Sequence, residues 1–509
     1  MTTQITHSDG IPLIPEHSHD SGSPRTTLNG NIKIKALPAN FYNKFLSEKG
    51  KQQKPSPIRG LYPLEKKPGV ISLLAGKPEP STFPFTSLSF TVKDPLQTDG
   101  SESTITIPQD QLSPGLQYSD TAGIPDLLKW ITTLQEIAHG RKHGMNASGA
   151  GEEGWRVSMG SGSQDLISKS ATALIDPGDC ILVESPVYAG VIPIFKHMDC
   201  KQIEVPTDSQ GIRSSSLKEI LENWPEGEKK PKLLYTVPYG CNPTGMTASL
   251  ERRKEVLKLA RQYDFIILED DPYYYLYYGK ATRPSSYFAL EATEPCGEES
   301  GEPYAEVGRV LRFDSLSKIL SAGLRIGFAT GPETILRVVD MLTANANLQV
   351  SSLTQLIAFR LLDSWGYDKF FVHTKNVSAF YEKKRDVFEN GLKKWLGGGI
   401  PEEGERDEGR LAEWVSPEAG MFFWFKLLVD PPSTDSSQNE DEQDSRTLIE
   451  THAYANGVLA LPGTVFLPNG SKTPYVRASF SLLTEEQVVE AMKRLRKTVL
   501  EVRSERANR

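Results

Sequence analysis

Short runs of apolar residues, many of them β-branched, alternate with amphipathic segments through the middle of the chain. Each run ends in polar or turn-forming residues, which is the pattern of strands buried in a parallel sheet. Strands that alternate with helices in this way favour an α/β architecture. The predicted strands cover residues 180–183, 233–237, 265–269, 310–313 and 325–330. Ligands of such sheets bind beyond the carboxyl ends of the strands, so we expect functional residues there.

The amphipathic segments predict helices with recognisable starts. Ser249 is a suitable N-cap, and Glu251 is favourable in the first turn of the helix that follows. Residues 351–396 return to a helical period, residues 421–427 have the pattern of a strand, and a closing helix is predicted from Thr484. This second mixture of helices and strands fits a smaller domain.

Changes in composition divide the chain of 509 residues. Residues 1–53 are polar and contain many Pro and Ser residues, so we expect a flexible N-terminal arm. A segment at 54–110 leads into a large domain at 111–365, and a small C-terminal domain follows at 366–509. Two stretches, 291–308 and 430–446, have the acidic composition of solvated surface insertions.

The overall composition narrows the class of protein. Hydrophobic residues make up 38% of the chain and the formal net charge is −8, which is typical of soluble globular proteins and not of nucleic-acid binders. Four cysteines without CxxC spacing indicate a reducing compartment, and the eight histidines show no metal-binding spacing. Neither a signal or transit peptide nor a run of about 18 apolar residues is evident. We therefore expect a cytoplasmic protein without a metal site or a membrane anchor.

The strongest chemical signal is the segment FDSLSKILSAGLRIGF at 313–328. It places Lys318 and two serines just after a predicted strand, with Arg325 seven positions beyond the lysine. A desolvated lysine amine can condense with an aldehyde, and hydroxyls beside a guanidinium suit a phosphate dianion. Taken alone, a lysine in a Ser-rich turn is more often a solvated surface residue.

Polar turns after two other predicted strands change that interpretation. The sequence NPTG follows the 233–237 strand, and DDPY follows the 265–269 strand. Upstream, MGSGSQDLI at 159–167 is a Gly-rich turn into a helix, where unpaired N–H groups can receive an anion, although an ordinary capped turn explains such a sequence in most chains.

Together, SLSK with LRIGF, NPTG and DDPY resemble the class I and II aminotransferases of pyridoxal-phosphate fold type I. The resemblance is closest to fungal aromatic amino acid aminotransferases and to kynurenine/2-aminoadipate aminotransferases, which are also similar at KPSPIR, LQYSDTAGIPDLL, ESPVYAG, AGMFFW, LPGTVF and VRASFS. It covers residues 54–499 or so. It implies a large domain with a mixed, mostly parallel sheet that binds pyridoxal 5'-phosphate, and a smaller α+β domain. Residues 54–110 are expected to contribute to the smaller domain and to the substrate site.

The resemblance assigns roles around the cofactor ring. Lys318 resembles the lysine that holds the cofactor as a Schiff base and later moves a proton between the substrate Cα and the cofactor C4′. Asp270 resembles the carboxylate that keeps the pyridine nitrogen protonated. Asn242 and Tyr273 match the pair that hydrogen-bonds the phenolic oxygen, and Tyr188 matches the aromatic residue stacked on the ring. For a single tyrosine without its motif, core packing is an equal alternative.

The resemblance also assigns the phosphate and substrate contacts. The phosphate-binding residues are Ser163, Gln164, Ser315, Ser317 and Arg325, with Tyr118 reaching in from a neighbouring subunit, which implies a homodimer. Arg477 matches the arginine that clamps the substrate α-carboxylate. Gly76 resembles a glycine whose backbone lies along the substrate. Arg59 resembles an arginine that recognises side chains, or is a surface residue of a Pro-rich loop. Lys77 departs from the family pattern, which commonly has an apolar residue there.

The implied function is transfer of the amino group from phenylalanine, tyrosine or tryptophan to 2-oxoglutarate, by a ping-pong mechanism. Phe422 and Trp424 are candidate aromatic walls, although any half-buried strand alternates in this way. The alternatives are a 2-aminoadipate or kynurenine aminotransferase and, less favoured, a lyase on the same fold. A pyridoxal-phosphate-binding transcription regulator would need a basic DNA-binding domain ahead of KPSPIR, where the sequence is Pro- and Ser-rich.

Overall fold

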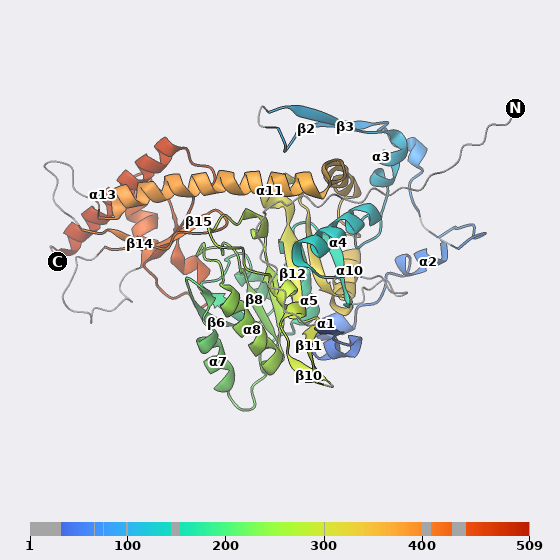
Figure 1. The fold of residues 1–509 in the computed structure, drawn as a ribbon, viewed down its shortest axis with the longest axis horizontal. Coiled ribbons are helices and arrows are strands. Elements are labelled where there is room, and N and C mark those ends of the chain that lie inside the picture. The colour runs from blue at the N-terminus through green and yellow to red at the C-terminus, as the bar shows by residue number, and fades with distance from the viewer. Residues whose placement is uncertain are drawn as a thin grey trace.

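The computed structural model describes residues 32–507, apart from 66, 75, 98–99, 144–152, 300, 399–408, 430–443 and the side chains of 59, 62 and 63. The described residues form a central eight-stranded sheet (Figure 1). Its strands, in spatial order, are β4 (Trp155–Gly160), β13 (Gly327–Pro332), β12 (Val310–Ser315), β9 (Ile266–Asp270), β8 (Leu233–Thr236), β5 (Cys180–Ser185), β6 (Lys201–Asp208) and β7 (Gly211–Ile212). The pairs from β12 to β6 are parallel, and the outer pairs are antiparallel. The sheet is therefore mixed, with a parallel centre.

The central strands confirm the sequence prediction, because each is buried on both faces. All residues of β8, β9 and β12 are buried, as apolar runs between helical layers require. The strand predicted at 325–330 instead begins at Gly327. Arg325 adopts a left-handed backbone conformation (φ 52°), which an extended strand cannot include.

Helices cover this sheet. Ser249 caps α8 as predicted, because its hydroxyl accepts a hydrogen bond from the Arg252 backbone N–H at 3.3 Å. The helix α5 packs against α10, and α8 packs against α7 and α9. The bounds are α4 (Pro125–His139), α5 (Ser163–Leu174), α7 (Ser214–Glu222), α8 (Leu250–Tyr263), α9 (Tyr287–Thr293) and α10 (Glu333–Ala346).

A smaller α+β domain follows. Its four-stranded antiparallel sheet has the order β14 (Ala412–Trp414), β15 (Phe422–Leu427), β17 (Tyr475–Ser479) and β16 (Leu461–Pro462). The long helix α11 (Ser352–Leu396) runs over the central sheet into this domain, where it packs against α13 (Glu485–Ala507) (Figure 1). The backbone of α11 is non-helical at Gly366. The predicted strand at 421–427 and the closing helix are confirmed.

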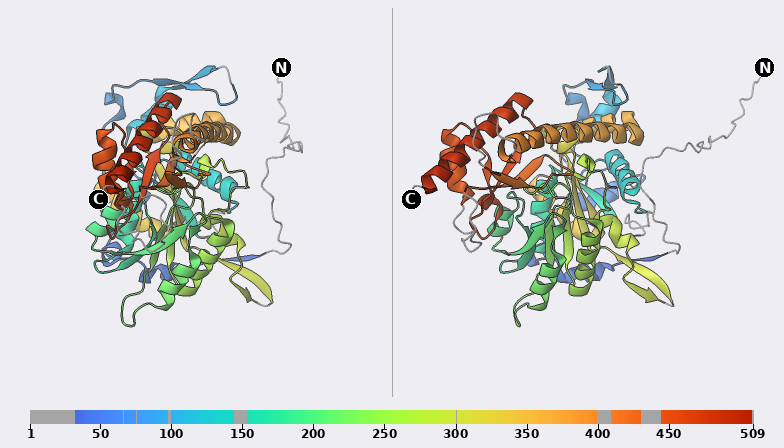
Figure 2. Two further views of the ribbon diagram at one scale, coloured as in Figure 1. Left: turned by 90° about the vertical axis from the view of Figure 1, so that its left-hand side faces the viewer. Right: turned by 60° about the vertical axis from the view of Figure 1, so that its left-hand side comes forward.

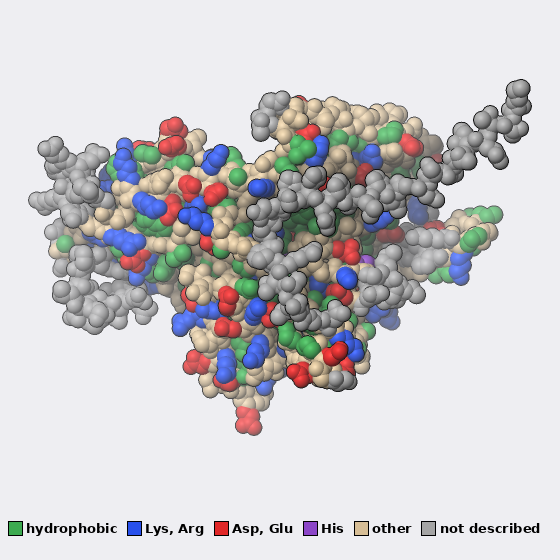
Figure 3. Space-filling view, in the orientation of Figure 1, with side chains coloured by type: hydrophobic (Ala, Val, Ile, Leu, Met, Phe, Trp, Pro, Cys, Tyr) green, Lys and Arg blue, Asp and Glu red, His purple; other side chains and the backbone are tan. Residues whose placement is uncertain are grey.

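The hairpin of β2 (Leu88–Lys93) and β3 (Glu102–Ile107) lies on the side of α11 away from the central sheet (Figures 1 and 2). It contacts α11 through β3, next to α3 (Gln109–Leu116). Acidic and basic side chains are interspersed over the face of the molecule shown in Figure 3. No helix among residues 32–507, within the described ranges, has both the length and the apolar character needed to cross a membrane.

The insertion predicted at 291–308 is only partly a solvated loop. Glu291 is buried and accepts hydrogen bonds from Arg141 at 2.8 Å and from the backbone N–H groups of Gly308 and Arg309 at 2.9 Å. The segment then forms the hairpin of β10 (Gly297–Glu299) and β11 (Glu302–Val307), which pairs with β1 (Lys33–Ala36). The surface prediction was wrong for Glu291, because buried partners compensate its charge, whereas much of the hairpin is exposed as predicted. Of the other insertion, 430–443 lies outside the described residues.

The predicted N-terminal arm also differs from expectation. Residues 1–31 lie outside the described part, but the rest of the arm forms β1, a 3₁₀ turn (Ala39–Lys44) and α1 (Glu48–Lys51). Tyr42, Phe45 and Leu46 are buried in the core of the large domain. Three large apolar side chains in a polar segment are enough to dock it, so residues 32–53 do not form the flexible arm predicted from the sequence.

Candidate active site

A cavity of about 250 Å³ lies beyond the ends of β8, β9 and β12. The carboxyl ends of parallel strands meet at one edge of a sheet, so the polar turns of distant segments converge there. The structure brings together the following residues predicted from the sequence: Ser163, Gln164, Tyr188, Asn242, Asp270, Tyr273, Ser315, Ser317, Lys318 and Arg325. Phe422 of β15 also lines the cavity, so both domains contribute to it.

Lys318 lies in the turn that follows β12. The Ser315 hydroxyl accepts a hydrogen bond from the Ser317 backbone N–H at 3.3 Å, which fixes the start of this turn. Burial of the amine, reinforced by the charge of Arg325, lowers the pKa of Lys318 below its usual value. Among the described residues, Lys318 has no hydrogen-bond or ion-pair partner. Because its pKa is lowered, a larger fraction of the Lys318 amine is unprotonated than in an ordinary lysine, and that fraction can act as a nucleophile.

Asp270 ends β9 and is almost fully buried. Its Oδ2 accepts a hydrogen bond from the Tyr235 hydroxyl at 2.6 Å, but no described residue donates to Oδ1. Burial, opposed by the Tyr235 hydrogen bond and aided by the nearby Asp314 and Glu184, raises the pKa of Asp270 to about 7. A buried carboxylate oxygen without a partner is a ready acceptor for an N–H group of a ligand.

One wall of the cavity is suited to an anion. Arg325 donates hydrogen bonds to the Ser317 hydroxyl at 3.2 Å and to the Ser161 carbonyl oxygen at 2.9 Å. This holds its guanidinium against Gly162, where a Cβ atom would lie 2.5 Å from Nη2 and the φ angle is 94°. Only glycine fits there. Ser163 then begins α5, whose first N–H groups have no partner within the helix.

Arg477 does not line the cavity but contacts two residues that do, one from each domain. From β17 it donates a hydrogen bond from Nη1 to Asn242 Oδ1 at 3.0 Å, and its guanidinium lies 4.5 Å from the centre of the Phe422 ring. Its Nε is buried, and no described residue accepts a hydrogen bond from it. Burial lowers the pKa of Arg477 below its usual value, but a guanidinium remains charged near neutral pH.

Two tyrosines form aromatic walls. Tyr188 follows β5 and is partly buried, and its ring packs so closely on Gly190 that a Cβ there would be 2.4 Å away. Burial, with a further contribution from the Asp270 charge, raises the pKa of Tyr188. Tyr273 meets Phe422 edge to face, with the ring centroids 6.1 Å apart. These rings enclose a space suited to a flat heterocycle.

Three other predicted residues also lie outside this cavity or outside the described part. Tyr118 is half-exposed and lines a different cavity, of about 550 Å³, beside Lys77, which pairs with Glu65 at 3.3 Å. Gly76 is exposed, with open space around its backbone. The side chain of Arg59 is outside the described residues. Neither Tyr118 nor Gly76 lines the cavity around Lys318.

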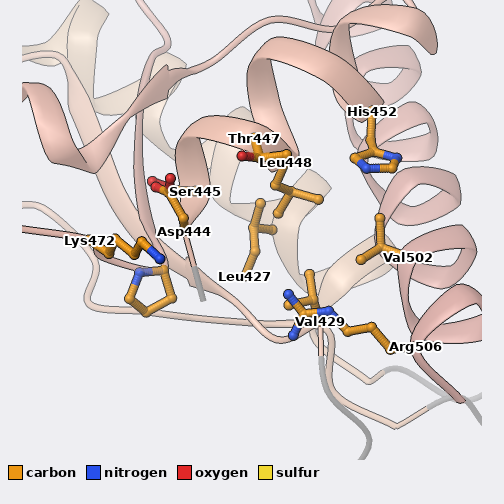
Figure 4. Close-up of a pocket in the computed structure, with 11 residues that line it drawn as sticks. Leu427, Val429, Asp444, Ser445, Thr447, Leu448, His452, Lys472, Val502 and Arg506 are labelled. Atoms are coloured by element: carbon orange, nitrogen blue, oxygen red, sulfur yellow. The ribbon is translucent and has the colours of Figure 1, made fainter. Parts of the chain in front are cut away.

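The two candidate aromatic walls separate. Phe422 lines the cavity, whereas Trp424 stacks on Tyr475, with centroids 5.3 Å apart, and lines another cavity between the domains. A further cavity of about 270 Å³ lies within the small domain, between the ends of β15 and α13 (Figure 4). The residues predicted for the active site do not line it.

Sequence reasoning did not identify several lining or supporting residues. Val237, Pro272 and Ala322 line the cavity with apolar atoms and carry no chemical signal. Tyr235 is different, because a tyrosine within the aliphatic run of β8 needs a partner for its buried hydroxyl. That requirement was visible in the sequence, although the identity of the partner was not.

Comparisons with known proteins identify relatives that are aminotransferases. Residues 108–495 match the family model of aminotransferase class I and II. The chain is 40% identical over 450 residues to aminotransferase tdiD of Emericella nidulans, covering 88% of this chain and 94% of that protein. It is 38% identical over 469 residues to the mitochondrial kynurenine/alpha-aminoadipate aminotransferase of Mus musculus, covering 90% and 99%. The structure of the aromatic aminotransferase Aro9 from C. albicans superposes with a TM-score of 0.73 at 26% identity, covering 91% and 98%.

Proposed function

Because the chain belongs to the class I and II aminotransferases, which are pyridoxal-phosphate enzymes, we propose that it transfers the amino group of phenylalanine, tyrosine or tryptophan to 2-oxoglutarate. Membership of the family rests on the match over residues 108–495 and on 40% identity along most of the chain. The preference for aromatic donors is supported by the similarity to an aromatic aminotransferase and by the aromatic rings of Phe422 and Tyr273 at the cavity.

One observation carries the proposal for the site. The cavity offers a lysine amine whose pKa is lowered by burial, a buried carboxylate oxygen to which no described residue donates, and an anion-binding wall, each on a different segment. These match the aldehyde, the pyridine nitrogen and the phosphate of pyridoxal 5'-phosphate. The donor set therefore fits this cofactor.

When bound, the cofactor supplies an aldehyde that condenses with amines and a ring that accepts electrons. Lys318 would hold the cofactor through its Nζ, which condenses with the aldehyde with loss of water, and the freed amine would move a proton to and from the substrate Cα. Asp270 Oδ1 would accept a hydrogen bond from the pyridine nitrogen and hold that nitrogen protonated. Asn242 and the Tyr273 hydroxyl bind the phenolic oxygen, and Tyr188 stacks on the ring.

The phosphate and substrate contacts follow the charges of the cavity. Ser163 at the N-terminus of α5, the Ser315 and Ser317 hydroxyls and Arg325 bind the phosphate, beside Gln164, whose amide donates to the Gly190 carbonyl oxygen at 2.7 Å. Arg477 binds the carboxylate shared by amino and oxo acids. Its fork geometry makes two parallel hydrogen bonds, and its buried Nε needs an acceptor.

Arg477→Lys is expected to raise KM for every amino and oxo acid by about tenfold to a hundredfold, the value of a hydrogen bond to a charged group. A lysine keeps the charge but loses the fork. Steady-state kinetics with two donors and two acceptors measures the change. Arg494→Lys is the control, since Arg494 is an exposed residue of α13 paired with Glu490. Unchanged KM values in Arg477→Lys would remove this residue from the substrate site.

We further propose a cytoplasmic homodimer in which Tyr118 of one copy reaches the phosphate of the other. Support comes from exposed apolar side chains in the N-terminal segment, where Ile71 is 91% and Leu73 is 99% exposed, and from the half-exposed Tyr118. In such a dimer the same segment brings Gly76 and Arg59 to the substrate. Sedimentation of the purified protein tests the association.

A donor panel tests the substrate proposal. With 2-oxoglutarate as acceptor, phenylalanine, tyrosine and tryptophan are expected to show a higher kcat/KM than 2-aminoadipate or kynurenine. Similarity to the Mus musculus enzyme makes the latter two the second candidate donors. A wide margin in favour of 2-aminoadipate would overturn the preference for aromatic donors. Pyridoxamine phosphate formed from an amino acid alone distinguishes transamination from lyase chemistry.

A further inference from the structure

The hydroxyl of Tyr235 lies behind the carboxylate that faces the cavity. Tyr235 is in β8, Asp270 ends the neighbouring parallel strand β9, and both side chains are almost completely buried. The hydroxyl donates to Asp270 Oδ2 at 2.6 Å. Burial raises the pKa of Tyr235 well above its usual value, and the charge of Asp270 raises it further. The hydroxyl therefore keeps its proton and remains the donor.

The surroundings leave this hydrogen bond without a substitute. Among the described residues, Tyr235 is the one that donates a hydrogen bond to the Asp270 carboxylate. The charges of two acidic side chains, Asp314 and Glu184, raise the pKa of Asp270, and the charge of Arg312 lowers it. That cation donates its own hydrogen bonds to Asp314 at 2.8 and 2.9 Å and to Asp271 at 2.7 Å.

We propose that Tyr235 is a positioning residue for the reaction: it occupies Oδ2 of Asp270, presents Oδ1 to the pyridine nitrogen of the cofactor, and keeps the proton on that nitrogen. The inference rests on the proposed role of Asp270. Tyr235 itself lies behind the carboxylate and acts through it.

Two physical effects support this role. The terminal torsion of an aspartate is soft, so a short hydrogen bond to one oxygen fixes the direction of the other. The same bond stabilises the ionised carboxylate. Without it, the pKa of Asp270 would rise further, and the carboxylate would compete more strongly for the proton of the pyridine nitrogen. A ring that has lost this proton accepts electrons less well.

The test compares Tyr235→Phe with Tyr42→Phe in the cofactor-loaded enzyme. Tyr42 is a matched control, since it is buried and its hydroxyl donates to the Gly308 carbonyl oxygen at 3.0 Å, outside the cavity. The measurements are kcat, KM, and the ¹⁵N chemical shift of protein loaded with pyridoxal 5'-phosphate labelled at the pyridine nitrogen. For Tyr235→Phe we expect kcat to fall by about tenfold to a hundredfold, KM to change little, and the ¹⁵N signal to shift toward the unprotonated value.

A second substitution guards against a folding defect. Replacement of Tyr235 by 3-fluorotyrosine keeps the shape and the hydroxyl and makes it a stronger donor, so activity and the protonated ¹⁵N signal are expected to persist. A Tyr235→Phe enzyme that matches Tyr42→Phe, or that loses activity with an unchanged ¹⁵N signal, would overturn the inference.

The Asp270→Asn variant distinguishes this failure from that of the proposed site. If Asp270→Asn leaves the ¹⁵N signal protonated, the proposed role of Asp270 is wrong, and with it the basis for Tyr235. If Asp270→Asn removes the proton while Tyr235→Phe does not, only the role of Tyr235 is wrong.

Discussion

Lys318→Ala is expected to abolish transamination, with a loss of about 10⁴-fold or more. The substitution removes both the amine that attaches to the cofactor and the group that moves the proton at the substrate Cα, and proton transfer alone contributes up to about 10⁴-fold. The burial that lowers the pKa of Lys318 is what fits its amine for both tasks. The measurement is turnover with an aromatic donor, together with the absorbance of the lysine-linked cofactor, which is expected to disappear.

Lys232→Ala provides the control for this substitution. Lys232 is a partly buried lysine that pairs with Asp179 at 2.9 Å, away from the cavity. The control is expected to keep both the absorbance band and the activity. A Lys318→Ala enzyme with an unchanged band would place the cofactor on another residue.

Asp270→Asn is expected to reduce kcat by about a hundredfold to several thousandfold. Removing one partner of a buried charge pair costs about 3–5 kcal/mol, and each 1.36 kcal/mol corresponds to tenfold in rate. Asparagine has nearly the shape of aspartate, so the cavity is preserved, but its neutral amide cannot hold the proton on the pyridine nitrogen. The loss is therefore expected mainly in kcat and less in KM.

Asp271→Asn is the contrasting variant. Asp271 is the next residue and is also buried, but it pairs with Arg312 at 2.7 Å and does not line the cavity. We expect that variant to lower the thermal unfolding midpoint more than the rate of the chemical step. Equal effects of the two substitutions on kcat at equal stability would contradict the role given to Asp270.

The sequence predicted those features that depend on short-range pattern. Apolar runs located the central strands, and polar turns after β8, β9 and β12 located the cavity, because parallel strands carry their ends to one edge. The side chains around Lys318 therefore converge as the motifs suggested, although Asn242 and Arg477 are 235 positions apart.

Features that depend on the partners of a buried polar group were missed. Glu291 can be buried because it pairs with Arg141, 150 positions away. The acidic composition of the segment around it had instead predicted exposure to solvent. The contact between Tyr235 and Asp270 depends on the register of β8 against β9, which no local pattern specifies. Tyr118 and Gly76 lie apart from Lys318 within the described chain, so their roles depend on the proposed second copy.

The most direct test of the central claim is to locate the cofactor on the chain. Borohydride reduction of the loaded enzyme fixes the cofactor on the amine to which it is attached, and peptide mass spectrometry then identifies the modified residue. We expect the phosphopyridoxyl group on Lys318, in the tryptic peptide of residues 313–325. Modification of a different lysine, or none, would contradict the account.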